Sequence, residues 1–247
     1  DKENGNKDNF TEMIPLYTVG NKASRELGKS NFERAIEKAE KAIARHSIKK
    51  KPEWNKSRRK TEKDIEWLSR REYNPFLWKA WMLMGRSQFY KGAFEEAATT
   101  FAYMSRLYRT QPAIYGKARA WLAKSYIEAG WLYDAEDVIR NMQRDSIDWR
   151  AVREWDYTFA DYYIHTGELE KAVPYLRRVI KQEMRRKQKA REWYLMGQIQ
   201  AALGNKDAAY NAFQHVIRSN PPYELEFNAR VAATEVMAAG QAKQMVS

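Results

Sequence analysis

Cysteine is absent from the 247-residue sequence, so disulfide bonds, thiolate metal ligands and cysteine nucleophiles are excluded. Histidine is scarce, and its three copies are His46, His165 and His215. We find no second ligand at helical spacing from any of them, so we expect no metal site and no cofactor. No run of about 18 apolar residues is present, which argues against a membrane-spanning helix.

Catalytic motifs are missing as well. The glycines form no phosphate-binding loop. Acidic residues are scattered, and pairs such as Glu95-Glu96 are adjacent, so they point in different directions on a helix. No set of residues combines a nucleophile, a base and an oxyanion site. We therefore expect no catalytic residue and no enzymatic activity.

What the sequence does contain is a helical repeat, which is clearest over residues 190–221. Apolar residues there follow helical spacing in two runs separated by one break. Trp193 and Gly197 belong to the first run, and Ala209 and Phe213 belong to the second. The small residues suit a close crossing of two helices, and the bulky ones suit the wedge between neighbouring hairpins. This pattern is typical of a tetratricopeptide repeat.

The small residues of the pattern recur along the chain. Those of the first helix are Gly85, Ala123, Ala160 and Gly197, and those of the second helix are Ala97, Ala135, Ala172 and Ala209. Both series advance by 38, 37 and 37 residues, against about 34 in an ideal tetratricopeptide repeat. The sequence therefore predicts an all-α fold. We expect a right-handed tetratricopeptide-repeat (TPR) α-solenoid of about five helical hairpins with a C-terminal capping helix.

The other segments complete the predicted organisation. The polar opening DKENGNKDNF has no signal-peptide pattern and looks like a cut made inside a longer protein. The predicted parts are a disordered start (1–9), a degenerate TPR-like hairpin (10–48, with helices over 10–27 and 31–45), a basic insertion with a short helix near 61–69 (49–75), four repeats (76–112, 113–148, 149–186 and 187–222), and a capping helix with a tail (223–247).

The positive charge is concentrated in two places. Residues 49–63 carry +6 and residues 177–191 carry +7, which together exceed the net charge of +12 by one. The excess therefore forms two patches rather than a uniformly basic surface, which favours local contacts. In the second patch, Arg177, Lys181 and Arg185 follow helical spacing and predict one exposed basic stripe. A solvated outer face is the default interpretation of this stripe, and binding to an acidic partner or to anionic lipid headgroups is the alternative.

The concave face of such a solenoid is the usual binding surface, and it is formed by the first helix of each repeat. We expect these positions to be exposed and to contact a protein partner. The predicted residues are Lys79, Arg86 and Tyr90; Lys117, Lys124 and Glu128; Tyr157, Asp161 and His165; and Arg191, Tyr194 and Gln198. The face is therefore predicted to be basic over its first two repeats and mixed later. A carboxylate clamp is disfavoured, because its asparagine positions hold Arg86, Lys124, Asp161 and Gln198 here.

Several stretches resemble one family beyond the general repeat. They are HSIKKKP at 46–52, REYNPFLWKAWMLMGRSQFYKGAFEEAATTFAYM at 71–104, WLAKSYIEAGWLYDAEDVI at 121–139 and NPPYELEFNARVAATE at 220–235. They are similar to the tetratricopeptide region of the SprE/PorW proteins of Bacteroidota. The similarity runs from about residue 32 to 235, and GWLYDAEDV and NPPYELEFNAR are its most specific parts, because the repeat alone does not require them.

The resemblance implies a lipoprotein on the periplasmic side of the outer membrane, which serves type IX secretion and, in gliding species, motility. It implies a scaffold that links the secretion translocon to periplasmic ring and motor components, with no catalytic residues. The lipid-bearing cysteine of the family has no counterpart here, so any anchor would lie outside this sequence. The alternative function is binding of nucleic acid or an anionic membrane surface through 49–63 and 177–191, although we expect no nucleic-acid partner.

Overall fold

The computed structural model describes residues 7–144 and 147–246 of the chain. Within these residues the fold is all-α: twelve α-helices and two short 3-10 helices are present, and there is no strand. The chain divides into two compact units. The first unit comprises Lys22–Thr158, and the second joins residues 7–21 to those from Phe159 onward. The disorder predicted for residues 1–6 falls outside the described residues.

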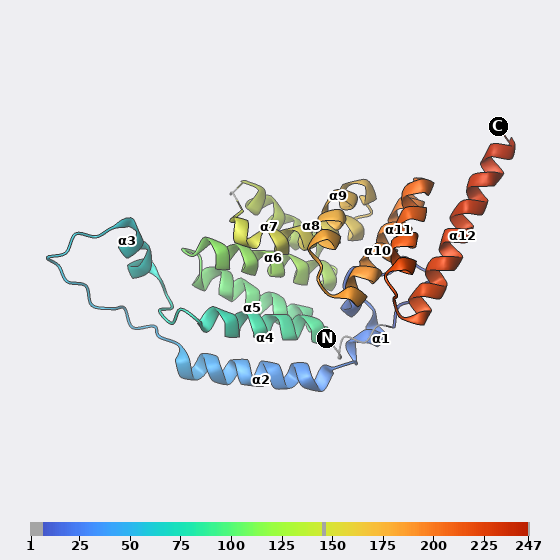
Figure 1. Cartoon of the computed structure of the whole chain (residues 1–247). Helices are drawn as coiled ribbons and strands as arrows, with labels where there is room; N and C mark the ends of the chain where they lie inside the picture. The colour runs from blue at the N-terminus through green and yellow to red at the C-terminus, as the bar shows by residue number, and fades with distance from the viewer. Residues whose placement is uncertain (1–6, 145–146, 247) are drawn as a thin grey trace. The chain divides into compact units, whose positions relative to one another are not determined.

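The first unit is a stack of helices in which sequence neighbours pack together (Figure 1). Helix α4 contacts α5, α5 contacts α6, and α6 contacts α7 and the 3-10 helix η2. Its elements are α1 (Lys22–Arg25), α2 (Lys29–His46), α3 (Glu62–Ser69), α4 (Leu77–Lys91), α5 (Phe94–Leu107), α6 (Pro112–Ala129), α7 (Leu132–Arg144), η2 (Trp149–Ala151) and the first part of α8 (Val152–His165).

The second unit continues the same pattern of helical hairpins. Helix α9 contacts α10, α10 contacts α11, and α12 contacts both α11 and α10. Its elements are η1 (Thr18–Gly20), the rest of α8, α9 (Leu169–Gln182), α10 (Arg186–Ala202), α11 (Lys206–Arg218) and α12 (Tyr223–Val246). Helix α12 leaves Tyr223, Phe227 and Val231 exposed. Among the described residues, no helix combines the length and apolar character needed to cross a membrane.

A glycine closes the first helix of each of the four predicted repeats. The glycines are Gly92, Gly130, Gly167 and Gly204, and their φ angles are 88°, 83°, 75° and 80°. This left-handed backbone conformation favours glycine, because a side chain there is strained. The turn that joins the two helices of each repeat therefore recurs at the same period as the small core residues.

The periodic small residues lie in the core, as the repeat pattern predicts. All eight are buried, and the six alanines among them are completely inaccessible to solvent. Gly197 shows why size matters, because a Cβ atom there would lie 2.5 Å from Cε1 of Phe213. Gly85 faces Phe101 in the same way, with a distance of 2.5 Å to Cζ. The predicted all-α fold of the TPR type is confirmed.

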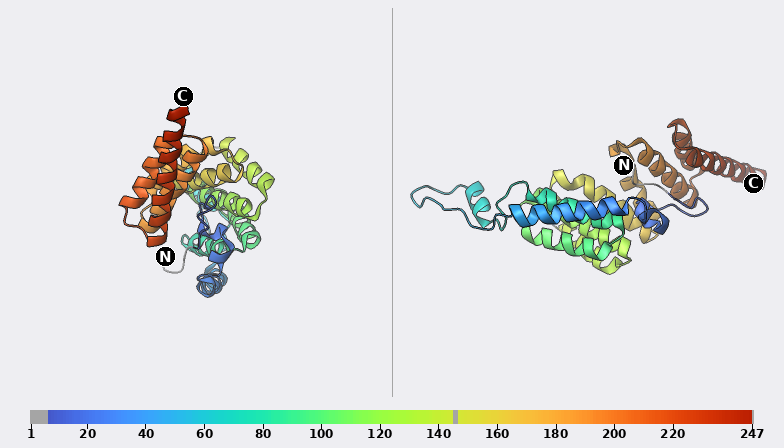
Figure 2. Two further views of the ribbon diagram at one scale, coloured as in Figure 1. Left: turned by 90° about the vertical axis from the view of Figure 1, so that its right-hand side faces the viewer. Right: turned by 90° about the horizontal axis from the view of Figure 1, so that it is seen from below.

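The predicted N-terminal hairpin is wrong in its first half. Residues 10–17 form no helix, and only the short η1 and α1 follow before α2. The apolar side chains of Ile14 and Leu16 are both buried, an alternation that suits an extended segment, and Pro15 between them disfavours a helix at Ile14. Helix α2 packs instead against α4 (Figures 1 and 2). The disorder predicted up to residue 9 is also wrong at Asp8, which is buried.

The basic insertion projects from the ends of α2 and α4 as a loop that carries α3 (Figures 1 and 2). Thr61 caps α3, because its hydroxyl accepts from Asp64 N–H while the Asp64 carboxylate accepts from Thr61 N–H. The base of the loop is closed by the buried Glu72. Its carboxylate accepts hydrogen bonds from Ser47 Oγ at 2.6 Å and from Ile48 N–H at 2.7 Å. No motif in the sequence indicated this closure.

Candidate functional site

One face of α10 carries a row of polar and aromatic side chains at helical spacing. Its members are Gln188, Arg191, Tyr194 and Gln198, and we call this row the α10 stripe. The stripe contacts residues 8–17 of the same unit, which we call the N-terminal segment (Figure 1). Because the segment forms no helix, its backbone groups are not consumed by helical hydrogen bonds and can bond to side chains.

Arg191 forms the centre of this contact. Its guanidinium donates to both carboxylate oxygens of Asp8, from Nε at 2.6 Å and from Nη2 at 2.9 Å. It also donates to the carbonyl of Leu16 at 2.8 Å and to the carbonyl of Pro15. Arg191 is 2% exposed, and the Asp8 side chain is fully buried. Each buried charge is therefore paired, which a charge removed from water requires.

The two glutamines of the stripe bond to the backbone of the segment. Gln198 accepts from Ile14 N–H at 3.0 Å through Oε1 and donates to the carbonyl of Glu12 at 2.8 Å through Nε2. Gln188 donates to the carbonyl of Leu16 at 3.3 Å. An amide side chain that offers both a donor and an acceptor can hold an extended backbone in the way that a neighbouring strand does.

Tyr194 provides the aromatic contact of the stripe. Its ring meets the ring of Phe10 edge to face, with 5.3 Å between centroids, and lies 5.4 Å from that of Phe213. Burial raises the pKa of Tyr194 to about 12, and the carboxylates of Glu235 and Asp8 add to the shift. The phenol is therefore neutral at physiological pH, and Tyr194 acts here as an aromatic surface.

The contacts divide into two kinds with different consequences. Hydrogen bonds to the backbone of Glu12, Ile14, Pro15 and Leu16 do not depend on the side chains of the segment. The ion pair of Asp8 and the ring contact of Phe10 do depend on them. An arrangement of this type binds a non-helical polypeptide, with affinity from the backbone and selectivity from a few side chains.

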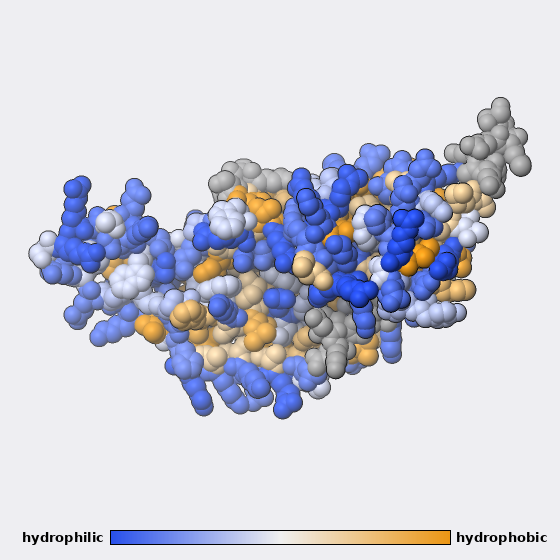
Figure 3. All heavy atoms as spheres, in the orientation of Figure 1, coloured by the Kyte–Doolittle hydropathy of each residue, from blue (hydrophilic) through white to orange (hydrophobic). Residues whose placement is uncertain are grey.

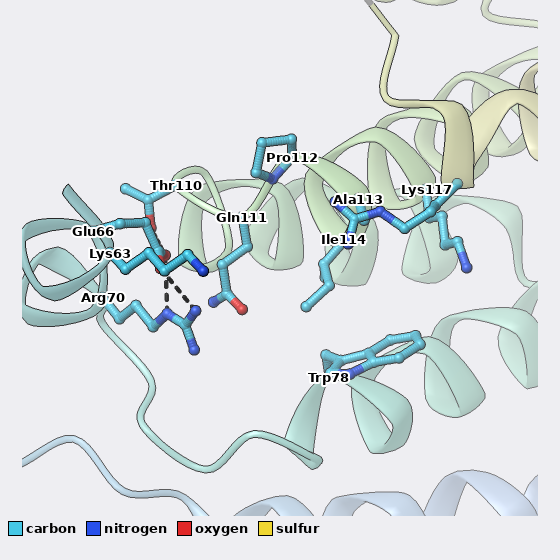
Figure 4. A pocket seen from close by; sticks show the side chains of 11 residues that line it. Lys63, Glu66, Arg70, Trp78, Thr110, Gln111, Pro112, Ala113, Ile114 and Lys117 are labelled. Carbon is cyan, nitrogen blue, oxygen red and sulfur yellow. Dashed lines mark hydrogen bonds and ion pairs between the residues drawn. The ribbon is translucent and has the colours of Figure 1, made fainter. Parts of the chain in front are cut away.

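The first unit contains a pocket of about 690 Å³ between α3, α4 and the start of α6 (Figure 4). Four cationic side chains line it, namely Lys63, Arg70, Lys117 and Arg150. In Figure 4, Lys63 extends from α3 and Arg70 from the position just after its end, and Trp78 lies on the α4 side below Ile114 of α6. Lys117 Nζ lies 5.7 Å from the centre of the Trp78 ring.

Three of these cations have acidic partners within the same unit. The guanidinium of Arg70 donates to both oxygens of Glu66, at 2.9 Å and 2.8 Å. Lys117 Nζ lies 3.9 Å from Glu154 Oε1. The third cation, Arg150, is paired with Asp148. The pocket is therefore close to charge-balanced rather than strongly cationic.

Arg150 binds Asp148 through two hydrogen bonds of 2.9 Å. This contact lowers the pKa of Asp148 to about 2, because the side-chain hydrogen bond from Arg150 stabilises the carboxylate, with help from the Arg150 backbone N–H.

The predicted concave residues differ in accessibility. Lys79, Arg86 and His165 are exposed; Tyr90, Lys117, Glu128 and Gln198 are half-buried; Lys124, Tyr157, Asp161, Arg191 and Tyr194 are buried. The prediction of exposure is therefore wrong for the last five. Lys124 is 2% exposed, with Nζ 4.0 Å from the centre of the Trp121 ring and 5.5 Å from that of Tyr157. In the second unit, Arg191 and Tyr194 are covered by the N-terminal segment.

The predicted basic stripe also needs correction. Arg177 and Lys181 are exposed on α9, but this helix ends at Gln182. Glu183 adopts an extended conformation, and its buried carboxylate accepts from Arg185 N–H at 2.8 Å and from Nη2 at 3.0 Å. Arg185 is therefore the residue before α10 and does not continue the row of Arg177 and Lys181.

One histidine has the acidic neighbour that the sequence analysis did not find. Asp161 precedes His165 by one helical turn, and His165 Nδ1 lies 3.3 Å from Asp161 Oδ1 and 2.9 Å from the Asp161 carbonyl oxygen. The expectation that no histidine has a ligand-type residue at helical spacing is wrong here. His215 packs instead, with its ring stacked 4.1 Å from that of Trp193.

Sequence reasoning also missed the partners on the other side of the α10 contact. The sequence predicts disorder at Asp8 and a helix at Phe10, and no pattern in it marks Gln188. The alternation of Ile14 and Leu16 around Pro15 was the one available signal for an extended segment. Nothing in the pattern indicated which helix the segment would contact.

The repeated hairpins, the turn glycines and the small core residues define an α-helical repeat protein of the TPR α-solenoid class. The family model for the tetratricopeptide repeat matches residues 157–183 and 190–223, which are the hairpins built from α8 with α9 and from α10 with α11. A search of curated proteins found no match to the chain. Tetratricopeptide repeats generally mediate protein–protein interactions, and proteins built from them are typically scaffolds without enzymatic activity.

Proposed function

We propose that this chain is a non-enzymatic scaffold that binds protein partners in type IX secretion, and in gliding motility where that occurs. The repeats support the general part of the proposal, because TPR hairpins are typical of protein-interaction scaffolds. The secretion-specific part rests on the resemblance of 71–104, 121–139 and 220–235 to the SprE/PorW proteins. By the same resemblance, its partners are the outer-membrane translocon and the periplasmic ring and motor components.

The single observation that carries the binding function is the contact of the α10 stripe with the non-helical N-terminal segment. Four side chains of one helix face hold a stretch of polypeptide through its backbone, its carboxylate and its aromatic ring. A repeat face with these contacts is suited to protein recognition rather than to chemistry on a small substrate.

The proposed location is the periplasmic side of the outer membrane, again from the family resemblance. A lipid anchor of the family type needs a cysteine, and the sequence has none. The anchor is therefore assigned to a residue outside this sequence. No membrane contact of the described residues is needed for the proposal.

Crosslinking mass spectrometry of the full-length protein in its native cell envelope tests this function. We expect crosslinks between lysines of this chain and components of the secretion translocon or the periplasmic ring. Crosslinks confined to proteins with no role in secretion would contradict the secretion assignment. They would leave the fold and the scaffold class untouched.

A pair of charge reversals then asks whether the exposed part of the predicted concave face takes part. Lys79 and Arg86 lie two helical turns apart on α4, and both are exposed. We expect Lys79→Glu with Arg86→Glu to reduce co-purification of the crosslinked partners. Arg106→Glu with Arg109→Glu, at exposed positions at the end of α5 and just after it, serves as the matched charge control. Equal co-purification by both variants would remove the α4 face from the binding surface.

A second candidate function is binding of an anionic surface through the insertion. Its residues 55–60 are all exposed, and Figure 3 shows the projecting loop covered by hydrophilic side chains. Electrostatic binding of this kind falls steeply as salt rises, because bound counterions are released. Sedimentation with anionic vesicles and gel shifts with nucleic acid, both at low salt, test it. No binding in either assay would eliminate this candidate.

A further inference from the structure

The α10 stripe is already occupied, and its occupant is part of the same chain. Asp8 and Arg191 are separated by 183 positions in sequence, yet they form a buried, bidentate ion pair. The N-terminal segment is not part of a repeat, and it enters the second unit from outside the series of hairpins. It therefore covers a face of the first helix of the last repeat, which is the kind of surface on which a TPR unit would hold a bound peptide.

We propose that the N-terminal segment is a built-in competitor, which occupies the α10 stripe until a non-helical segment of a partner protein replaces it. This inference rests on the proposed scaffold function and adds to it the class of ligand and the means of regulation. The partner segment has the chemistry of its competitor: a carboxylate side chain, an aromatic ring two residues later, and an apolar pair around a proline.

The carboxylate is the first requirement. Arg191 is buried, and an unpaired buried guanidinium is strongly unfavourable. The stripe is therefore stable only with an acidic group in place, either from Asp8 or from a partner. Arginine also binds a carboxylate through two parallel hydrogen bonds, which fixes the position and plane of the carboxylate.

The aromatic and apolar positions are the second requirement. Phe10 meets the ring of Tyr194 edge to face, and Ile14 and Leu16 are at most 1% exposed. Pro15 lacks an N–H group and holds Ile14 in an extended conformation, which lets Ile14 N–H reach Gln198. A segment with proline between two apolar residues is thus already shaped for the stripe.

The way in which the segment is held makes exchange feasible. Its two ends are buried, at Asp8 and at residues 14–17, apart from the half-buried Pro15. The side chains of Thr11, Glu12 and Met13 between these two buried anchors are exposed, and Gln198 holds this stretch by the carbonyl of Glu12. A competing chain can displace one anchor before the other. The segment is joined to the rest of the chain through η1, so it rebinds at a high effective concentration when no partner is present.

A labelled peptide with the sequence of residues 7–19, KDNFTEMIPLYTV, is the probe. Its binding is measured by fluorescence anisotropy to the full chain and to a full chain whose own segment is weakened by Asp8→Asn and Ile14→Ser. We expect the weakened chain to bind the peptide at least about tenfold more tightly than the unchanged chain, because the competitor has been weakened. A peptide that carries asparagine in place of its aspartate should bind about tenfold more weakly.

Matched variants locate the binding to the stripe. In the weakened chain, Gln198→Ala should reduce peptide affinity, because it removes both backbone hydrogen bonds. Gln214→Ala, which replaces a half-buried glutamine on α11, should leave the affinity unchanged. Excess peptide added to the unchanged chain should also increase hydrogen exchange in residues 7–19 of the protein.

Two results would overturn the proposal. One is a weakened chain that keeps its circular-dichroism spectrum and its exchange protection in α10 and α11 but binds no peptide. The other is loss of protection throughout α10 and α11 in the weakened chain, which would make the segment a structural part of the core. The proposed function is judged separately: secretion crosslinks without peptide binding would refute only the competitor. Peptide binding without such crosslinks would refute only the secretion role.

Discussion

Replacing Gly197 with alanine tests the close helix crossing on which each hairpin depends. The added Cβ would lie 2.5 Å from Cε1, 2.7 Å from Cζ and 2.8 Å from Cδ1 of Phe213. Carbon atoms in proteins do not approach so closely, so the ring or the helix has to shift. Forcing one methyl group into a packed core costs about 1–3 kcal/mol.

The same substitution also raises the helix propensity at this position, and this gain in stability must be subtracted from the packing cost. Alanine is favoured over glycine inside a helix by about 1 kcal/mol. The net effect expected for Gly197→Ala is therefore a loss of about 0–2 kcal/mol in the local stability of α10 and α11. Comparing Asn211→Ala with Asn211→Gly, at an exposed position in α11, measures the propensity difference without any packing change.

Hydrogen exchange followed by mass spectrometry is the suitable assay, because repeat proteins need not unfold in one step. The opening free energy of α10 and α11 is compared in Gly197→Ala, Phe213→Leu and the double variant. When the smaller, non-aromatic leucine replaces Phe213, Gly197→Ala should no longer destabilise the hairpin, which corresponds to a coupling of about 1–3 kcal/mol. If Gly197→Ala stabilises the hairpin by the propensity difference even with Phe213 present, the steric argument is refuted.

Three other predictions concern the first unit. Lys124→Glu should lower the stability of α6 by more than about 2 kcal/mol, because Lys124 is buried against Trp121. The exposed Arg86→Glu on α4 should cost less than about 1 kcal/mol, and hydrogen exchange in α6 and in α4 measures the two effects. Thr61→Ala should destabilise α3 by about 1 kcal/mol through loss of its cap, and unchanged exchange in α3 would contradict the capping role. NMR titration should give Asp148 a pKa near 2, and in Arg150→Ala this pKa should return toward its ordinary value of 3.8. Because that pKa is lowered on folding, the contact stabilises the fold above pH 3.8 and is lost as the pH falls toward 2; equal titration in both proteins would refute the pairing.

The helices and their repeat could be predicted from the sequence because the contacts that define them are local. Gly197 and Phe213 lie within one hairpin, and the same small positions return every 37 or 38 residues. Helical spacing and turn glycines act over the same short range. The capping of α3 by Thr61 is local for the same reason, and its predicted helix lies within one residue of the observed one.

Accessibility could not be predicted in this way, because it depends on residues distant in the sequence. Lys124 occupies a position of the first helix that a repeat pattern assigns to the concave face, but the ring of Tyr157 lies 5.5 Å from its ammonium group. The end of α9 is a similar case at short range. Helical spacing continues through Arg185, yet the buried carboxylate of Glu183 binds the backbone and side chain of Arg185 and the helix stops.

Local spacing was sufficient to establish the class of this protein, an all-α repeat of tetratricopeptide type, because its period, turns and core residues all follow from neighbours along the chain. The contact of the last repeat with the N-terminal segment could be identified only from the tertiary structure. The N-terminal segment binds α10 through backbone groups, which every residue possesses, and through a carboxylate 183 positions away. Backbone hydrogen bonds leave no residue pattern, and a single long-range ion pair has no period, so only the folded chain shows that Arg191, Tyr194 and Gln198 are already occupied.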